Sequence, residues 1–165
     1  MKQLILIRGP ICAGKSTVVR ILRGRLKKAS HVDFDALKQQ IDDSESSPWR
    51  QELALKASLF LTEKLMKLGR TIIIDIPSSK QNQYQAYRKL AEKNGYSLIP
   101  FLLRPPLKTC LERNRLKMRD KYKIPDKKIK EYYRKTFPVP GELKFDTSKA
   151  SSKMIASGIL RSLPH

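Results

Sequence analysis

The chain has 165 residues, with 35 lysines and arginines against 15 aspartates and glutamates, so its formal net charge is +20. This length is enough to bury one hydrophobic core, and a hydrophobic content of 40% without a low-complexity tract excludes a disordered chain. No apolar run approaches the ~20 residues of a membrane span and no signal-peptide pattern opens the chain, so we expect a cytoplasmic protein with no membrane partner. The two cysteines and two histidines suggest neither a disulfide framework nor a zinc site.

The positive charge is concentrated in two segments. Residues 1–30 carry eight basic and no acidic residues, and residues 104–135 carry thirteen basic and four acidic residues. The stretch between them, residues 31–103, is almost neutral, with ten against nine. Clustered lysines and arginines gain affinity for phosphate backbones through counterion release, so the pattern favours a nucleic-acid partner. The alternative is a soluble surface that is basic throughout.

A phosphate-binding loop follows the first predicted strand, residues 2–7. The pattern G-x-x-x-x-G-K-[ST] is matched by Gly9, Gly14, Lys15 and Ser16. A helix-like run follows the loop, and this order of strand, loop and helix directs backbone N–H groups and a helix N-terminus at one anion. The residues predicted to bind the nucleotide are Gly9, Pro10, Ile11, Cys12, Ala13, Gly14, Lys15, Ser16 and Thr17. Lys15 would contact the β- and γ-phosphates of ATP, and the Ser16 hydroxyl would hold Mg²⁺.

Two carboxylates follow a second predicted strand, residues 31–34. If the strand continues, its alternation places Asp33 and Asp35 on one face. Asp35 lies just past the carboxyl end of the strand, where open α/β sheets bind ligands, so it can accept the proton of an attacking hydroxyl. Lys38, three residues further, can hold an anionic acceptor. The alternatives are that Asp35 caps a helix and that Lys38 is a solvated lysine.

A third acidic position, Asp75, ends the apolar strand predicted over residues 70–76. An aspartate at this place resembles the second acidic element of nucleotide-binding P-loop proteins, which holds magnesium, and the alternative is a strand-end turn. Two more strands are predicted at residues 96–103 and 143–147. Helices are predicted between the strands and after the last one, at about residues 15–28, 35–41, 49–68, 78–94, 107–116, 125–137 and 152–160. The leucines of the helix over residues 49–68 are assigned to the core.

This alternation predicts one three-layer α/β domain over residues 1–165, with a five-stranded parallel sheet flanked by helices. Residues 113–123 form the densest basic segment of the chain. In a phosphoryl-transfer enzyme such a segment can close over the donor as a lid, here at about residues 113–125, and place an arginine on the transferring group. The alternative is a solvated helix end.

Taken together, these motifs resemble the P-loop kinases of the adenylate-kinase-like group, and among them the polynucleotide 5′-hydroxyl kinases related to the kinase domain of phage polynucleotide kinase. The resemblance is carried by the loop from Gly9 to Thr17, by Asp33 to Lys38, by Thr71 to Asp75, and by Leu111 to Arg115 continuing to Arg119. It implies that the loop binds ATP, that Asp35 is the general base, and that Arg113 and Arg119 act from the lid on the migrating phosphoryl group.

The chain departs from that family at two places. Lys38 stands where the phage-type enzymes have an arginine, and a lysine cannot make a bidentate fork with a phosphate. Ile76 and Pro77 follow Asp75 in place of small polar residues. The expected function is transfer of the γ-phosphate of ATP to a hydroxyl, most simply the 5′-hydroxyl of DNA or RNA. The alternatives are a kinase acting on a sugar, nucleoside or antibiotic, and a nucleic-acid-binding ATPase that transfers to water.

Overall fold

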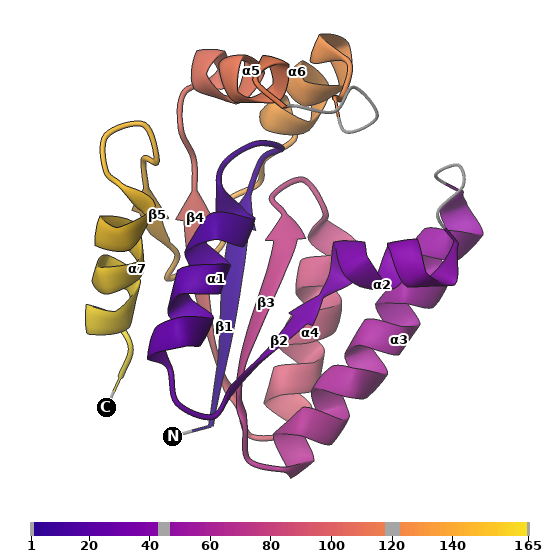
Figure 1. Cartoon of the computed structure of the whole chain (residues 1–165). Helices are drawn as coiled ribbons and strands as arrows, with labels where there is room; N and C mark the ends of the chain where they lie inside the picture. The colour runs from indigo at the N-terminus through magenta and orange to yellow at the C-terminus, as the bar shows by residue number, and fades with distance from the viewer. Residues whose placement is uncertain (1, 43–46, 118–122, 165) are drawn as a thin grey trace.

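The computed structural model describes residues 2–42, 47–117 and 123–164. Strands and helices alternate along the chain, as the hydrophobic pattern predicts (Figure 1). In chain order they are β1 (Gln3–Gly9), α1 (Lys15–Arg25), β2 (Ala29–Asp33), α2 (Phe34–Ile41), α3 (Pro48–Lys67), β3 (Thr71–Pro77), α4 (Gln81–Lys93), β4 (Ser97–Leu103), α5 (Leu107–Arg115), α6 (Asp126–Arg134), β5 (Leu143–Phe145) and α7 (Ser152–Arg161).

The five strands form one parallel sheet in the order β2-β3-β1-β4-β5. β1 lies in the centre and pairs with β3 on one side and β4 on the other, with Leu6 opposite both Ile74 and Pro100. Every residue of β1 is buried. A strand covered on both faces has no solvent side, which explains the uninterrupted apolar run from Leu4 to Ile7.

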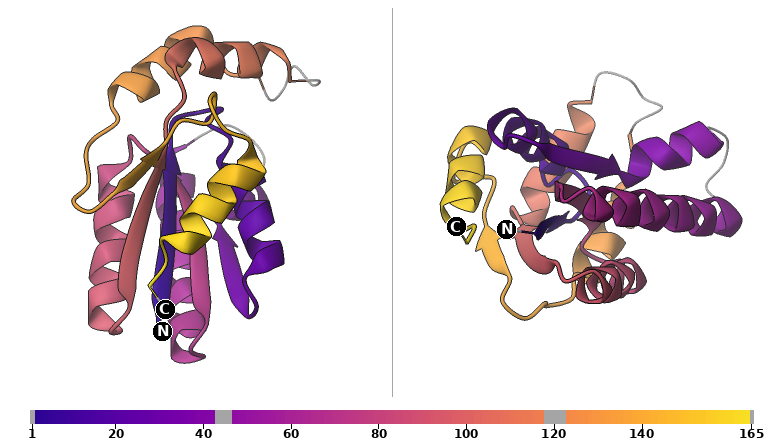
Figure 2. Two further views of the ribbon diagram at one scale, coloured as in Figure 1. Left: turned by 90° about the vertical axis from the view of Figure 1, so that its left-hand side faces the viewer. Right: turned by 90° about the horizontal axis from the view of Figure 1, so that it is seen from below.

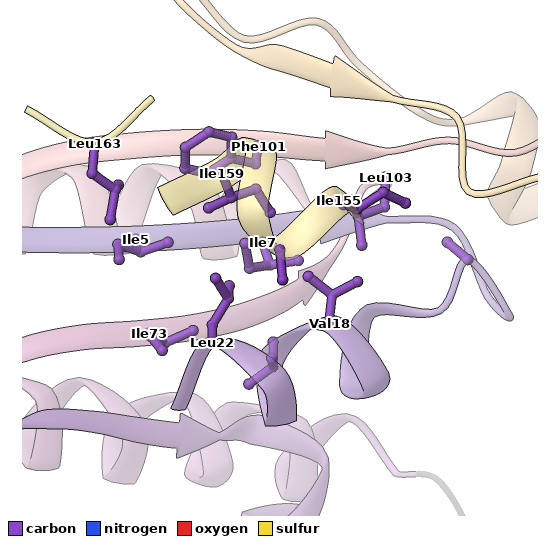
Figure 3. Close-up of a cluster of buried hydrophobic side chains, with 13 residues drawn as sticks. Ile5, Ile7, Val18, Leu22, Ile73, Phe101, Leu103, Ile155, Ile159 and Leu163 are labelled. Carbon is purple, nitrogen blue, oxygen red and sulfur yellow. The ribbon is translucent and has the colours of Figure 1, made fainter. Parts of the chain in front are cut away.

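Helices cover both faces of the sheet (Figures 1 and 2). α1 and α7 cover one face, where Val18 and Leu22 of α1 pack with Ile155 and Ile159 of α7 and with Ile5 of β1 (Figure 3). On the other face, Met66 of α3 and Tyr84 and Tyr87 of α4 pack against the sheet in a second core cluster. The chain therefore has three layers, as predicted from the alternation of strands and helices.

The carboxyl ends of the strands meet at one edge of the sheet, and α5 and α6 lie beyond this edge (Figure 1). The loop after β1, helix α2 after β2 and the turn after β3 all leave from the same edge. Tyr133 of α6 donates its hydroxyl to the carbonyl of Pro105 at 2.9 Å, which holds the pair of helices to the end of β4. Ligands of open α/β sheets bind at such an edge.

Two expectations about helices are wrong in detail. α2 begins at Phe34, so Asp33 and Asp35 do not share a face of an extended strand, and the helix cap is Asp33, whose carboxylate accepts from Ala36 N at 3.0 Å. In α3 the fully buried positions are Ala54, Ser58, Thr62 and Met66, four residues apart. The first three of these are small side chains, which let the helix lie close to its neighbours. Of the leucines predicted to be core, Leu55, Leu59 and Leu65 pack against it, whereas Leu53, Leu61 and Leu68 are exposed.

No helix in residues 2–42, 47–117 or 123–164 is long and apolar enough to span a membrane.

Candidate nucleotide and acceptor site

The loop between β1 and α1 is shaped for an anion. A Cβ on Gly9 would lie 2.6 Å from the carbonyl oxygen of Leu103, so only glycine fits this close approach of two strands. Gly14 has φ +91° and stands at the N-cap of α1, where it provides no side-chain hydrogen bond. The first N–H groups of α1 therefore lack the usual side-chain cap and are available to an anionic ligand.

Lys15, the first residue of α1, turns back over this loop. Its ammonium donates to the carbonyls of Gly9 at 3.1 Å and Pro10 at 3.2 Å. Burial lowers the pKa of Lys15, while the nearby carboxylates of Asp75 and Asp35 act in the opposite direction. A phosphate at the loop would supply the negative charge that this desolvated ammonium lacks.

A cavity of about 420 Å³ opens over the loop. It brings together parts of the chain that are far apart in sequence: the phosphate-binding loop, the carboxylate of Asp35 and the guanidinium of Arg113. Its lining residues are Ile11, Cys12, Ala13, Gly14, Lys15, Ser16, Thr17, Asp35, Pro77, Arg113, Lys117 and Ile124. Gly9 and Pro10 are not in the lining, but their carbonyls accept from Lys15. One cavity with an anion-binding end and a carboxylate can hold a phosphate donor and a hydroxyl together.

Asp35 lies in the first turn of α2, and its side chain is 70% exposed. Lys38, one turn later, places Nζ 2.5 Å from Asp35 Oδ1 and 5.1 Å from the centroid of the Phe34 ring. The ammonium of Lys38 is thus held beside the carboxylate on the same helical face, as the spacing predicts. An acceptor hydroxyl that approaches Asp35 would also approach a cation.

Asp75 lies near the end of β3, directly opposite Asp33 of β2. Its Oδ1 is 2.9 Å from Nε2 of His31, a residue of the neighbouring strand that the sequence did not single out. Ser16 lines the cavity, whereas Asp75 does not and lies behind Lys15, whose pKa it influences.

The Ser16 hydroxyl and the Asp75 carboxylate are oxygen donors of the type that magnesium takes. In proteins this ion commonly takes one or two carboxylates and completes its shell with water and substrate phosphates. Within the described part of the chain no three His, Cys, Asp or Glu side chains form a cluster that could hold a metal by themselves. A magnesium ion here would therefore depend on the nucleotide.

Arg113, from α5, connects the loop to the end of the sheet. It donates to the Thr147 hydroxyl at 2.8 Å, the Thr147 carbonyl at 2.6 Å and the Cys12 carbonyl at 3.4 Å. The Thr147 hydroxyl in turn donates to the Ala13 carbonyl at 2.9 Å. Thr147 was not predicted as a site residue, since nothing local in its sequence indicates contact with a loop more than 130 residues earlier.

The second predicted lid arginine, Arg119, lies outside the described residues, as do all of residues 118–122 of the lid predicted at about residues 113–125. On either side of that gap, the Asn114 side chain donates to the Ile124 carbonyl at 2.7 Å and accepts from the Ile124 N–H at 3.0 Å. Lys117 and Ile124 also line the cavity. The end of α5 and the residues before α6 are thus joined beside the loop.

The sequence profile of the AAA domain family AAA_33 matches residues 4–139. The chain belongs to this family. It is a P-loop kinase-like domain, and the matched residues include the phosphate-binding loop, α2 and the whole of β3. The five-stranded parallel sheet flanked by helices is the fold that the motifs predict.

One curated relative and two solved structures are similar to this P-loop domain. The first is a protein of Autographa californica nuclear polyhedrosis virus with the name "Putative bifunctional polynucleotide kinase/RNA ligase", 26% identical over 148 residues that make up 84% of this chain and 21% of the viral protein. A solved chain of the Pnkp1/Rnl/Hen1 RNA repair complex has a TM-score of 0.69 at 23% identity, covering 82% of this chain and 44% of that one. The APS kinase CysC of Mycobacterium tuberculosis, solved with AMPPNP and APS, has a TM-score of 0.73 at 18% identity, covering 97% and 96%.

The chain spans about a fifth of the length of the curated viral relative that it matches. The two likenesses to solved structures are below 25% identity and show a shared fold.

Proposed function

We propose that this P-loop domain transfers the γ-phosphate of ATP to the 5′-hydroxyl of DNA or RNA. The observation that carries the proposal is the single cavity lined by the phosphate-binding loop, Asp35 and Arg113. The loop would bind the phosphates of the donor, and the carboxylate would stand beside the acceptor hydroxyl. Phosphoryl transfer needs little more than this positioning together with stabilisation of charge.

Each residue has a role that follows from its place. Lys15 and the N–H groups at the start of α1 would neutralise the β- and γ-phosphates. Asp35 would take the proton from the acceptor oxygen as that oxygen bonds to the γ-phosphorus and the bond to the leaving ADP breaks. Lys38 would keep that carboxylate oriented and attract an anionic acceptor.

Ser16 and Asp75 would hold Mg²⁺, which neutralises charge on the phosphates when bound. Arg113 lines the cavity and is held there by hydrogen bonds to Thr147 and to the Cys12 carbonyl of the loop. From this place its guanidinium would stabilise the negative charge that develops during transfer. Arg119 would act with Arg113 from the lid.

The polynucleotide acceptor is supported by charge and by kinship. A net charge of +20 favours a polyanionic substrate over a neutral sugar or nucleoside. The viral relative is named for polynucleotide kinase activity, and the RNA repair complex also contains a chain with this fold.

The proposal is tested by replacing Asp35. An Asp35→Asn variant, assayed with ATP, magnesium and a 5′-hydroxyl oligonucleotide, should lose about 10²–10⁴-fold in transfer rate, the usual contribution of a positioned general base. Its ATP affinity, measured by fluorescence of a labelled nucleotide, should be unchanged.

The matched control is Asp33→Asn, two residues away. Asparagine is as good a helix cap as aspartate, so this variant keeps the Ala36 bond and should keep full activity. Equal activity of Asp35→Asn and wild type would show that Asp35 is not the base. Loss of activity in both variants would mean that α2 has been disturbed and that the acceptor carboxylate must be sought elsewhere.

A further inference from the structure

Of the two helical layers that cover the sheet, the layer formed by α1 and α7 is the more basic. Residues 15–28 and 146–164, which include both helices, contain nine basic residues and one acidic residue. The helices on the opposite face, α3 and α4, contain the same number of residues in total but have seven basic and three acidic residues. The α1/α7 layer therefore carries a larger net positive charge than the α3/α4 layer.

The two faces also differ in how their charges are compensated. On α3 and α4 the acidic side chains pair with neighbouring bases, as in Lys56–Glu52, Lys93–Glu63 and Arg88–Glu92. Among the residues that the structure describes, no basic side chain of the α1 and α7 layer forms an ion pair. Exposed members of this layer are Arg20, Arg23, Arg25, Lys27, Lys28, Lys149, Lys153 and Arg161.

α1 and α7 pack side by side on the same face of the sheet, so the exposed sides of both helices belong to one face of the molecule (Figures 1 and 2). Arg25 of α1 donates to the Ser157 hydroxyl of α7 at 2.6 Å, which joins the two helices on their exposed side. Lys153 and Arg161 are eight residues apart on α7, or about 12 Å along the helix, a length that spans three to four nucleotide steps of a duplex strand.

The basic face also contains a groove. A cavity of about 470 Å³ lies against α7 and is lined by both Lys153 and Arg161, with Phe145 and the 64% exposed Met154 contributing apolar surface. Cationic edges beside an apolar floor suit a strand whose phosphates meet the lysine and arginine while a base contacts the floor.

We propose that this α1/α7 face binds the phosphate backbone of a nucleic acid away from its reacting 5′ end. In Figure 1 and in the right-hand view of Figure 2, α1 lies between α7 and the β2–α2 segment that carries Asp35, so a strand leaving the acceptor carboxylate can continue over α1 toward α7. The identity of the polyanion as nucleic acid rests on the proposed function. The consequence is that substrates long enough to reach this face bind more tightly than short ones.

The test compares two triple variants of the full chain in binding a 30-nucleotide strand. The face variant carries Arg20→Gln, Arg23→Gln and Lys153→Gln. The control variant carries Lys64→Gln, Lys67→Gln and Lys89→Gln, three exposed lysines of α3 and α4. Both lose three charges, so the net charge is matched, and thermal melting with ATP binding verifies that both are folded.

Fluorescence anisotropy at several salt concentrations provides the readout. If each of the three lost cations contacts a phosphate, the plot of log affinity against log salt concentration should be less steep by about 2 in the face variant than in the wild type. On going from 1 M to 0.1 M salt, the affinity of the face variant should therefore rise about a hundredfold less than that of the wild type. The control variant should keep both slope and affinity, and the binding of a five-nucleotide strand should change little in either.

Other outcomes would overturn the proposal. Equal losses in the two triple variants would mean that net charge alone governs binding. Failure of the wild type to bind the long strand at 50 mM salt would exclude the face as a nucleic-acid site. Binding of anionic vesicles that disappears only in the face variant, with strand binding intact, would assign the face to another polyanion.

The strand in these experiments carries a 5′-phosphate, so its binding does not depend on catalysis. If the protein binds the long strand through this face but does not phosphorylate a 5′-hydroxyl strand, the proposed reaction is contradicted and the binding face is not. If the protein phosphorylates short acceptors but the face variant binds the long strand as tightly as the wild type, the binding face is contradicted and the proposed reaction is not.

Discussion

The buried pair of Arg8 and Glu142 allows a quantitative prediction about the free energy of unfolding. Both side chains are almost fully buried, and Arg8 Nη1 donates to Glu142. Arg8 Nη2 donates to the carbonyls of Ser78 at 3.1 Å and Phe137 at 2.9 Å, and the guanidinium stacks 4.2 Å from the Phe137 ring centroid. Burial lowers the pKa of Arg8 and raises that of Glu142, and each partner opposes the shift of the other.

A Glu142→Gln variant keeps the shape and one acceptor but leaves the Arg8 cation without its counter-charge. Removing one partner of a buried pair costs about 3–5 kcal/mol, and the retained hydrogen bond places this case near the lower end, at about 3 kcal/mol. For a domain of this size each kcal/mol lowers the melting temperature by roughly 2–4 °C, so the expected fall is about 6–12 °C. The free energy of unfolding of a protein is about 5–15 kcal/mol, so a loss of about 3 kcal/mol is a large share of it.

The assay is urea unfolding followed by circular dichroism, with the wild type, Glu142→Gln and the double variant Arg8→Met/Glu142→Leu. The double variant should recover most of the loss, because removing both charges also removes their desolvation cost. Arg8 Nε and Glu142 Oε2 are buried without a hydrogen-bond partner, so the pair is not fully compensated in the first place. A loss below 1 kcal/mol in Glu142→Gln, or a double variant less stable than the single one, would refute this reasoning.

Two further predictions concern packing and pH. Burial raises the pKa of the Cys110 thiol to about 11 from the ordinary value of 9.0. The folded state therefore holds this proton more tightly than the unfolded state, and its contribution is complete below pH 9 and is lost as the pH rises toward 11. Urea unfolding at pH 8 and pH 10.5 should show a difference between wild type and Cys110→Ala that narrows by about 1–2 kcal/mol at the higher pH, and a constant difference would contradict the burial argument. A Cβ on Gly158 would lie 2.9 Å from the Phe145 ring, whereas one on Gly24 would meet nothing within 4 Å. Gly158→Ala should thus destabilise the fold by about 1 kcal/mol and Gly24→Ala should stabilise it by about 0.5–1 kcal/mol in thermal melts, and the same sign for both would refute the packing explanation.

Features of this molecule that depend on local sequence could be predicted, and those that depend on tertiary neighbours could not. The phosphate-binding loop and the buried strand that carries Asp75 could be predicted, because a glycine-loop motif and a short apolar run are both signals of local sequence. The helical spacing also predicts that Asp35 and Lys38 share one face, and their contact agrees with this.

The failures have a common physical cause. Only some of the α3 leucines lie in the core as predicted, and the helix also buries the polar Ser58, whose hydroxyl lies 2.8 Å from that of Tyr87 in α4. Which stripe of a helix faces inward depends on the partner that it meets, and no periodicity within the helix reports that partner. In the same way the pairing of His31 with Asp75 follows from the register of β2 against β3, which the sequence of either strand does not contain.

The proposed reaction is tested most directly by incubating the purified protein with γ-labelled ATP, magnesium and short DNA and RNA oligonucleotides. Strands with a 5′-hydroxyl should acquire label, and otherwise identical strands with a 5′-phosphate should not. The Asp35→Asn variant should label the 5′-hydroxyl strands about 10²–10⁴-fold more slowly. Absence of label on every 5′-hydroxyl strand, in a preparation that binds ATP, would contradict the assignment of a polynucleotide acceptor.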